Sequence, residues 1–392
     1  MLHKPATSLS HAGGSLPIKG QARMRPWPTT RWIINGRFLT QKTTGVQRVA
    51  RELTKAIDDI IGTRTIPATF QLMCEHNADL SSLQLRNIAV EPVGHTTGYV
   101  WEQVTLPRAA GNANLLCLGN TAPLWPLARN RSVSVMIHDL SYRLYPEAYS
   151  LPYRAAHAVM LPLILKRARH IIAVSETEKA SISALEDDLH NRITVAQNGG
   201  CIDRGGHAMA NIKARFGNGY VLYVGSLSLR KNISGLKQVA VRLARERGQS
   251  FLFVGSNSRF FAETDLNIPE DVAHLVKFVG HIEDLDQISE IYQNARCLVF
   301  PSFYEASPLP PLEAMSCGCP VVGSDIPSMR ERCGEAIGYC NPHDLNDIYR
   351  MVSAVLDDPD LTAKLVAKGY EQSQRFSWQR QAEHILAALL AD

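Results

Sequence analysis

The sequence has no run of about 18 apolar residues, the length that a membrane-spanning helix needs. Residues 1–28 also lack the apolar stretch of a secretory signal and are rich in glycine, proline and serine, so we expect a flexible tail and a cytoplasmic location. The eight cysteines include no Cys-x-x-Cys pair, and the spacing of Cys317, Cys319, Cys333 and Cys340 fits no common zinc site. Reduced thiols in the protein core are therefore favoured.

Three other motifs are missing. No Gly-x-Gly-x-x-Gly motif is present, which argues against a nicotinamide-dependent dehydrogenase. No Asp-x-Asp motif lies within an expected strand, so we expect neither a metal nor another cofactor. No dense basic run with interleaved aromatic residues is present, which argues against a nucleic-acid partner.

Charge is small over the whole chain, at +4, but it is unevenly distributed. Residues 1–204 carry 23 Lys and Arg against 15 Asp and Glu, a net charge of +8, and the remainder carries a net charge of −4. A basic N-terminal half is suited to an anionic membrane or an anionic acceptor, and the alternative is an ordinary solvated surface.

Apolar runs alternate with helical stretches along the 392 residues, a length that suits two domains. Short, nearly continuous apolar runs joined by helices are typical of buried parallel strands. The sequence therefore predicts an α/β protein with two Rossmann-like domains, 29–205 and 206–375. The expected strands are 31–36, 114–120, 132–140, 170–175 and 192–200 in the first domain, and 218–226, 250–256, 275–282, 296–302 and 320–325 in the second.

Two acids, Glu305 and Glu313, flank a proline-rich segment that follows the strand ending near 302. Pro310 or Pro311 suits the first position of a helix, which places Glu313 in its first turn and Glu305 in the loop before it. In parallel sheets, ligands bind beyond the carboxyl ends of the strands, so both acids are expected to face one cleft. Carboxylates that accept hydroxyl hydrogens beside amides that hold phosphate would suit a nucleotide sugar. The alternative is a helix whose first-turn acid offsets the helix dipole.

The segment PSFYEASPLPPLEAMSCGCPVV (301–322) resembles the donor-binding signature of retaining glycosyltransferases of family 4, which have the GT-B fold. Similar segments follow the family order elsewhere: TGVQRVARELTKAI, VMIHDLSYRLYPEAY, AVSETEK, VAQNGG, LYVGSLSLRKN and FSWQRQAEHIL. The resemblance implies two Rossmann-like domains that face a central cleft, with a closing helix, 376–392, that packs back on the N-terminal domain.

Residue roles on the donor side follow from this resemblance. Glu313 matches the acid that binds the ribose hydroxyls, and Glu305 matches the acid that contacts the transferred sugar. Lys231 and Arg230 are implied to hold the diphosphate, whose charge grows as the glycosidic bond breaks. The implied set of donor-binding residues is completed by Gly225, Ser226, Ser307, Leu309, Val279 and Ile282, the last two near the base.

The N-terminal half is implied to supply the remaining contacts. His138 matches the active-site histidine and is assigned to the donor sugar or its diphosphate, not to deprotonation of the acceptor. Gly45, ahead of a helix, lets backbone approach the acceptor or a phosphate. Trp101, Glu102 and Gln103 are candidate acceptor contacts, and a core tryptophan is the alternative for Trp101.

The sequence departs from the commonest form of the signature, Glu-Gly-Phe-Gly-Leu-Pro, because residues 305–310 are Glu-Ala-Ser-Pro-Leu-Pro. Pro308 has no amide to donate, which leaves the backbone contacts at 306 and 308 and the identity of the sugar open. Ser226 stands where many members carry arginine, and Arg230 can compensate for that charge.

The function implied is a metal-independent, retaining transfer of a hexose in bacterial surface polysaccharide synthesis, as in mannosyltransferases and rhamnosyltransferases. GDP-mannose is the favoured donor, with a dTDP- or UDP-sugar as the alternative. A nucleotide-sugar epimerase of the same fold and a silent partner of another transferase are the competing interpretations. Segment 153–170 combines apolar and basic residues, so it is either a helix that lies on the inner face of the membrane beside a lipid-linked acceptor, or a core helix.

Overall fold

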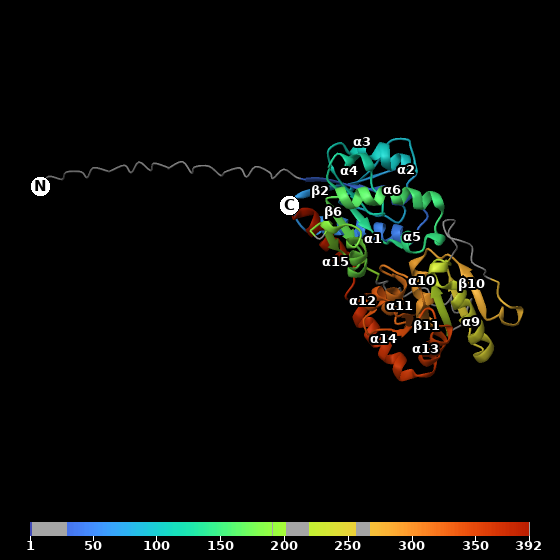
Figure 1. Cartoon of the computed structure of the whole chain (residues 1–392). Helices are drawn as coiled ribbons and strands as arrows, with labels where there is room; N and C mark the ends of the chain where they lie inside the picture. The colour runs from blue at the N-terminus through green and yellow to red at the C-terminus, as the bar shows by residue number, and fades with distance from the viewer. Residues whose placement is uncertain (2–29, 190, 201–218, 256–266, 392) are drawn as a thin grey trace.

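The structure is a computed structural model that describes residues 1, 30–189, 191–200, 219–255 and 267–391. The expected tail at 2–28 lies outside the described residues. Two parallel sheets, one above the other in Figure 1, organise the described chain.

The N-terminal sheet has seven parallel strands in the order β3-β2-β1-β4-β5-β6-β7. Side chains alternate along these strands, so that Trp32 and Ile34 join one core and Ile33 joins the other. Burial on both faces explains why the central strands are nearly continuous apolar runs. The strands are β1 (Thr30–Asn35), β2 (Ala68–Cys74), β3 (Ala89–Pro92), β4 (Asn114–Cys117), β5 (Val133–Ile137), β6 (His170–Ala173) and β7 (Ile193–Val195).

Helices cover both faces of this sheet. One face packs against α1 (Gly45–Thr63) and the other against α3 (Leu106–Ala110), α4 (Leu124–Ala128) and α6 (Leu151–Arg167). Further helices of this domain are α2 (Gly98–Val100), α5 (Ser141–Leu144) and α7 (Glu176–Ser183). In Figure 1, α3, α4 and α6 form the outer layer of this domain.

The C-terminal sheet has six parallel strands in the order β10-β9-β8-β11-β12-β13. The strands are β8 (Tyr220–Val224), β9 (Phe251–Val254), β10 (Val276–Gly280), β11 (Ala295–Phe300), β12 (Val321–Ser324) and β13 (Gly338–Cys340). The helices are α9 (Ile233–Arg247), α10 (Leu285–Gln293), α11 (Pro310–Ser316), α12 (Pro327–Cys333), α13 (Leu345–Asp357) and α14 (Pro359–Ser373). Three strands, β2, β3 and β13, were not among the expected strands.

The chain returns to the N-terminal domain at its C-terminal end through α15 (Trp378–Leu390). Ser377 caps this helix by accepting a hydrogen bond from the Arg380 amide, and Ile385 and Leu389 join the core beneath α1. A Cβ atom at Gly199 would lie 2.4 Å from the Trp378 ring. The segment at Gly199, where the chain leaves the N-terminal domain, therefore packs tightly against Trp378, where the chain returns to it. Helix α15 therefore packs on the N-terminal domain, beside α1.

Segment 153–170 forms most of α6, with Pro162 inside the helix. Met160, Leu161, Ile164 and Leu165 are buried against the sheet, whereas Lys166 and Arg167 in the last turn are exposed. In the part of the chain that the structure describes, no helix has the length and apolar character required to cross a bilayer.

Candidate functional site

One acidic and two basic side chains meet at the carboxyl ends of β8 and β11. Lys231 donates a short hydrogen bond to Glu305 Oε1, and Arg230 Nη1 lies 3.6 Å from Glu305 Oε2. Arg230 also donates to the Tyr304 carbonyl at 2.8 Å, and its own carbonyl accepts from the Phe303 amide at 3.0 Å. The two loops are therefore tied together, and the structure brings the three predicted residues into one cluster.

Burial sets the electrostatics of this cluster. All three residues are at least nine-tenths buried, so each charge depends on its partner. Burial lowers the pKa of Lys231 to about 8, against the opposing pull of Glu305. Burial also acts to lower the pKa of Arg230, but the nearby Glu305 carboxylate outweighs it and the pKa is raised. Two cations face Glu305 in this cluster, and Asp139 lies near enough to act on both of them. The two cationic side chains suit a polyanionic ligand.

The loop after β8 approaches its neighbour closely at two glycines. A Cβ at Gly255 would lie 1.8 Å from the Gly225 carbonyl oxygen, and Gly255 has a φ of +148°. Gly225 itself has a φ of +153° and would place a Cβ 2.8 Å from the Tyr223 hydroxyl. These positions require glycine. Ser226 follows directly, and its carbonyl accepts from the Tyr223 hydroxyl at 2.8 Å.

Glu313 lies in the first turn of α11, which starts at Pro310 and Pro311 as the sequence predicts. Its side chain is only 2% exposed, and its Oε2 accepts from the Tyr292 hydroxyl at 2.9 Å. Its Oε1 accepts from Arg48 of the N-terminal domain. The acid predicted for the ribose is therefore held by one donor from each domain.

His138 follows β5 at its carboxyl end and is buried. Its backbone amide donates to Asn120 Oδ1 at 2.6 Å, and its Nε2 lies 2.8 Å from the Leu118 carbonyl. Because a carbonyl only accepts, Nε2 carries the proton. Burial lowers the pKa of His138, which favours a neutral ring with Nδ1 as an acceptor. A neutral ring can accept a sugar hydroxyl but adds no charge at a diphosphate.

A second contact crosses between the domains beside Glu305. The Tyr304 hydroxyl donates to Glu178 Oε2 of α7 at 2.6 Å, and the Tyr304 ring lies 6.1 Å from the Tyr145 ring. Ala306 and Leu309 pack into the core cluster that contains α1 and β1. Segment 304–309, which is predicted to bind the donor, is thus packed on the N-terminal domain. Sequence reasoning missed both Arg48 and Glu178, although both lie in segments that carry the family resemblance.

The remaining donor-side predictions lie around this cluster. Ser307 Oγ is buried without a hydrogen-bond partner among the described residues. Leu309 is 7% exposed and immediately precedes α11. Val279 and Ile282 are partly buried against the C-terminal core, on either side of Gly280, which has a φ of +88°. They lie at the carboxyl end of the edge strand β10.

The residues predicted to contact the acceptor differ in their surroundings. Gly45 is exposed at the first residue of α1, and a Cβ atom there would meet no atom within 4 Å. Trp101 is fully buried and its indole nitrogen donates to the Val93 carbonyl at 2.8 Å, which corrects the predicted sugar contact in favour of a core tryptophan. Gln103 is occupied by the Ala122 carbonyl and the Leu124 amide.

Glu102 is also a buried structural residue. It is 1% exposed, forms an ion pair with Arg37 at 3.2 Å, and accepts from Asn35 at 2.7 Å and Thr121 at 2.8 Å. This network joins β1 to the loop after β4. The direct acceptor contact predicted for Glu102 is therefore corrected, because its oxygens are turned into the domain.

Comparison with known proteins identifies the C-terminal part of the chain. Residues 209–372 match the family described as Glycosyl transferases group 1. The matched region contains Gly225, Arg230, Lys231, Glu305 and Glu313, whereas Arg48, His138 and Glu178 come from outside it.

Curated relatives extend the similarity beyond the glycosyl transferases group 1 domain. The O-antigen chain mannosyltransferase B of Escherichia coli is 35% identical over 164 residues, 41% of this chain and 43% of that protein. The serotype-specific mannosyltransferase WbdA of Escherichia coli is 26% identical over 360 residues, 88% of this chain and 43% of that protein. The chain thus spans less than half the length of these relatives.

Solved structures agree with the two-sheet architecture. Sucrose-phosphate synthase from Thermosynechococcus elongatus is 18% identical with a TM-score of 0.69, over 91% of this chain and 97% of that chain. HepE from Anabaena, in complex with UDP-glucose, is 17% identical with a TM-score of 0.69, over 92% of this chain and 99% of that chain. The fold is GT-B, as the resemblance implied.

Proposed function

We propose that this protein is a retaining glycosyltransferase that moves a hexose from a nucleoside diphosphate to a saccharide during surface polysaccharide synthesis. The observation that carries the proposal is the buried cluster of Arg230, Lys231 and Glu305, with Glu313 in the same segment 304–313. The matched glycosyl transferases group 1 domain contains all four residues. Their chemistry is complementary to a sugar, a diphosphate and a ribose.

The proposed mechanism assigns each group a task. Arg230 and Lys231 neutralise the charge that collects on the diphosphate as the anomeric C–O bond breaks. Glu305 accepts hydroxyl hydrogens of the transferred sugar, and His138 accepts another through Nδ1. The acceptor hydroxyl attacks from the face that the diphosphate leaves, and its proton passes to a departing phosphate oxygen. The new C–O bond keeps the anomeric configuration, and the reaction needs neither a carboxylate nucleophile nor a metal.

We propose mannose as the sugar and GDP-mannose as the donor. The support is the description of both curated relatives as mannosyltransferases, one of them of O-antigen chains. Pro308 lacks the amide that the commonest signature provides, so the sugar is recognised mainly by side chains. A dTDP- or UDP-sugar is the alternative donor.

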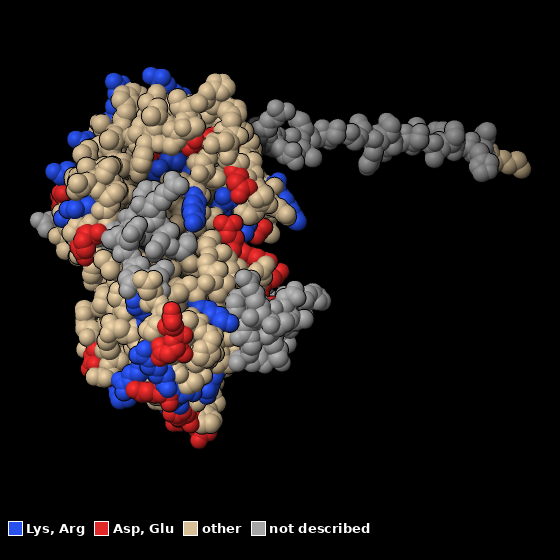
Figure 2. Space-filling model, turned by 90° about the vertical axis from the view of Figure 1, so that its right-hand side faces the viewer, with Lys and Arg blue, Asp and Glu red and all other residues tan. Residues whose placement is uncertain are grey.

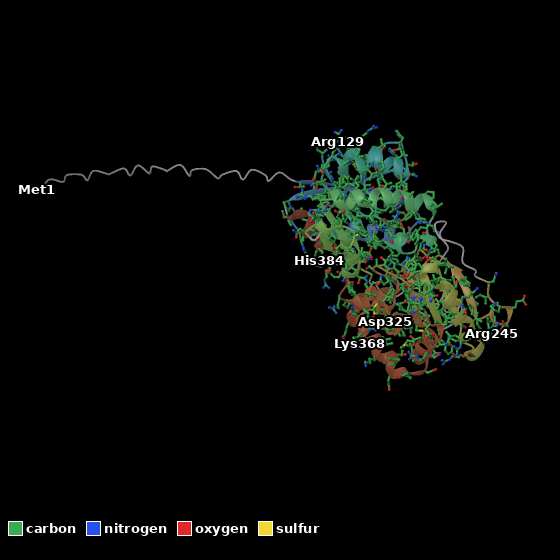
Figure 3. The ribbon with its side chains drawn as sticks, in the orientation of Figure 1. Met1, Arg129, Arg245, Asp325, Lys368 and His384 are labelled. Atoms are coloured by element: carbon green, nitrogen blue, oxygen red, sulfur yellow. The ribbon has the colours of Figure 1, made fainter. Side chains whose placement is uncertain are left out.

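We further propose that the acceptor is lipid-linked and that the outer helical layer of the N-terminal domain touches an anionic membrane at its cytoplasmic side. Leu151 and Val159 of α6 are 73% and 66% exposed, Val100 of α2 is 58% exposed, and Trp125 of α4 is 50% exposed. Arg129 lies over the Trp125 ring at 4.5 Å, and Figure 3 places Arg129 at the end of this domain farthest from the C-terminal domain. In Figure 2, Lys and Arg gather along this outer end.

Product analysis tests the transfer. The protein is incubated with GDP-mannose, dTDP-rhamnose or UDP-glucose, each with and without a lipid-linked saccharide acceptor. We expect a product one hexose longer from GDP-mannose, with the anomeric configuration of the donor. An epimerised nucleotide sugar formed from donor alone would overturn the proposal in favour of a non-hydrolysing epimerase, and no consumption of any donor would favour a silent partner of another transferase.

Vesicle sedimentation tests the membrane contact. We expect recovery with anionic vesicles to exceed recovery with neutral ones at low salt, and to fall when Lys166, Arg167 and Arg169 become Ser, since each basic residue contributes about 1 kcal/mol near the surface. The matched control replaces Arg242, Arg245 and Arg247 of α9 in the other domain with Ser. Equal recovery on both vesicle types would favour a soluble acceptor.

A further inference from the structure

Arg48 is the residue through which the N-terminal domain contacts the predicted ribose acid. It lies in the first turn of α1, directly after Gln47, whose Oε1 accepts from the Thr44 amide at 3.1 Å. This contact orders the start of the helix and fixes the direction of Arg48. Its Nη1 then donates to Glu313 Oε1 across the domain boundary. Sequence patterns gave no reason to select it.

Hydrogen-bond accounting at this contact leaves room for a ligand. Glu313 receives one bond on each oxygen, from Arg48 and from Tyr292. An ionised carboxylate offers about four acceptor positions, so about two remain. Arg48 Nε is buried and has no hydrogen-bond partner among the residues that the structure describes. Unused acceptors and one unused donor therefore lie side by side where the ribose is proposed to bind.

We propose that Arg48 is a positioning residue for the donor, supplied by the opposite domain. It orients the buried Glu313 carboxylate so that ribose hydroxyls donate to the free positions, and it offers Nε–H to an oxygen of the same nucleotide. The nucleotide-binding site thereby includes the N-terminal domain. This inference rests on the proposed function, because the ligand is the nucleoside diphosphate of that reaction.

The contacts of Arg48 favour a residue that helps Glu313 to bind the ribose over one that competes with the ribose for Glu313. Glu313 is 2% exposed, so loss of Arg48 would leave a desolvated carboxylate with Tyr292 as its single donor. A carboxylate in that state binds ribose hydroxyls less well, because its rotamer is less constrained. Competition would instead require Arg48 to occupy every acceptor position of Glu313, and the geometry leaves positions free.

The test is calorimetric titration of the full chain with GDP, UDP and dTDP, alongside steady-state kinetics with the preferred donor. We expect Arg48→Ala to weaken nucleoside diphosphate affinity and raise the donor KM by about tenfold, as loss of a charged hydrogen bond does, with kcat changed less than threefold. Arg48→Lys, which keeps the charge, should recover part of the affinity. Arg48→Met keeps the buried stem and should match Arg48→Ala.

Two controls separate positioning from stability. Arg51→Ala removes a buried arginine one turn further along α1, which contacts the Asp79 carbonyl at 3.0 Å and Ser82 at 2.9 Å. It should lower Tm without changing nucleoside diphosphate affinity. Adding Arg48→Ala to Glu313→Gln should weaken binding by less than twofold beyond Glu313→Gln alone, because Arg48 acts mainly through that acid.

The outcomes separate the two proposals. A wild type that binds a nucleoside diphosphate while all three Arg48 variants bind equally well or more tightly overturns the inference alone. So does full additivity of Arg48→Ala with Glu313→Gln. A wild type that binds none of the three nucleotides and transfers no sugar overturns the proposed function, and this inference with it.

Discussion

The two sides of the site differ in how their side chains are positioned. On the C-terminal side, Arg230, Lys231 and Glu305 extend from loops at the carboxyl ends of strands, and they meet in a cluster. On the N-terminal side, Trp101 and Glu102 lie in a helical turn and are buried within their own domain. The comparison teaches that a residue after a buried strand has a predictable destination, whereas a residue on a short helix does not.

The largest effect should come from breaking the C-terminal cluster. Lys231→Met removes one of the two cations proposed for the leaving diphosphate and leaves Glu305 with Arg230 alone. We expect a loss of about 100- to 1000-fold in kcat, measured with saturating donor. Lys364→Met, at an exposed position of α14, is the control and should leave kcat unchanged. A loss below tenfold for Lys231→Met would remove this lysine from the mechanism.

Substitutions of the two acids Glu305 and Glu313 should affect donor binding and turnover differently. We expect Glu313→Ala to weaken nucleoside diphosphate binding about tenfold, because this acid is assigned to the ribose through charged hydrogen bonds. Glu305→Ala should mainly lower kcat, because its assigned partner is the transferred sugar, which the diphosphate lacks. Isothermal calorimetry with the nucleoside diphosphate alone measures the difference. Equal losses of affinity would contradict the two assignments.

A substitution on the N-terminal side should change the stability of the protein and leave nucleotide binding unchanged. Glu102→Ala breaks the buried contacts with Arg37 and Asn35 and leaves the Arg37 guanidinium without its carboxylate. We expect the free energy of unfolding to fall by about 3 kcal/mol, with nucleoside diphosphate affinity unchanged. Chemical denaturation and calorimetry on the same sample decide this. A lost affinity with unchanged stability would restore Glu102 to the substrate site.

Glu178 provides a pH-dependent refinement, because it joins the N-terminal domain to Tyr304. Burial raises the pKa of Glu178 to about 7 from its ordinary value of 4.5, although the Tyr304 hydroxyl opposes this rise. The folded state therefore favours the neutral acid, and this contribution, at most about 3 kcal/mol, is present below pH 4.5 and is lost as the pH rises through 7.

The variant Glu178→Gln should not lose stability in this way. We expect the Tm of the wild type, relative to that of Glu178→Gln, to fall by several degrees between pH 5 and pH 8. Differential scanning calorimetry at both pH values measures this change. A constant difference between the two proteins would show that Glu178 has the same charge throughout the range.

Removal of metal ions is expected to have no effect on transfer. Among the described residues, no group of three or more His, Cys, Asp and Glu side chains is arranged to hold a metal ion. The two cations beside Glu305 are proposed to do the work of a metal at the diphosphate. Transfer should therefore continue at an unchanged rate in EDTA. Complete loss that manganese or magnesium restores would overturn this part of the mechanism.

The sequence predicted the central strands of both sheets, because burial on two faces produces continuous apolar runs. It missed β2, whose start alternates between buried and exposed residues, and the edge strands β3 and β13. It also predicted the loop acid and the helix start at Pro310. Arg48 and Glu178 escaped because their importance depends on partners more than 120 residues away, and local periodicity does not report such pairs.

The position of α15 at the end of the chain determines when the N-terminal domain can complete its folding during translation. Every strand of the N-terminal sheet has been translated by Val195, yet the helix that packs beside α1 begins at Trp378. The ribosome must therefore release the entire C-terminal domain before the first domain can bury Ile57 and Leu53 beneath their final neighbour. The nascent N-terminal domain carries an apolar surface during that interval. A chain truncated before α15 should consequently aggregate or be degraded, even though every proposed donor-site residue has already been made.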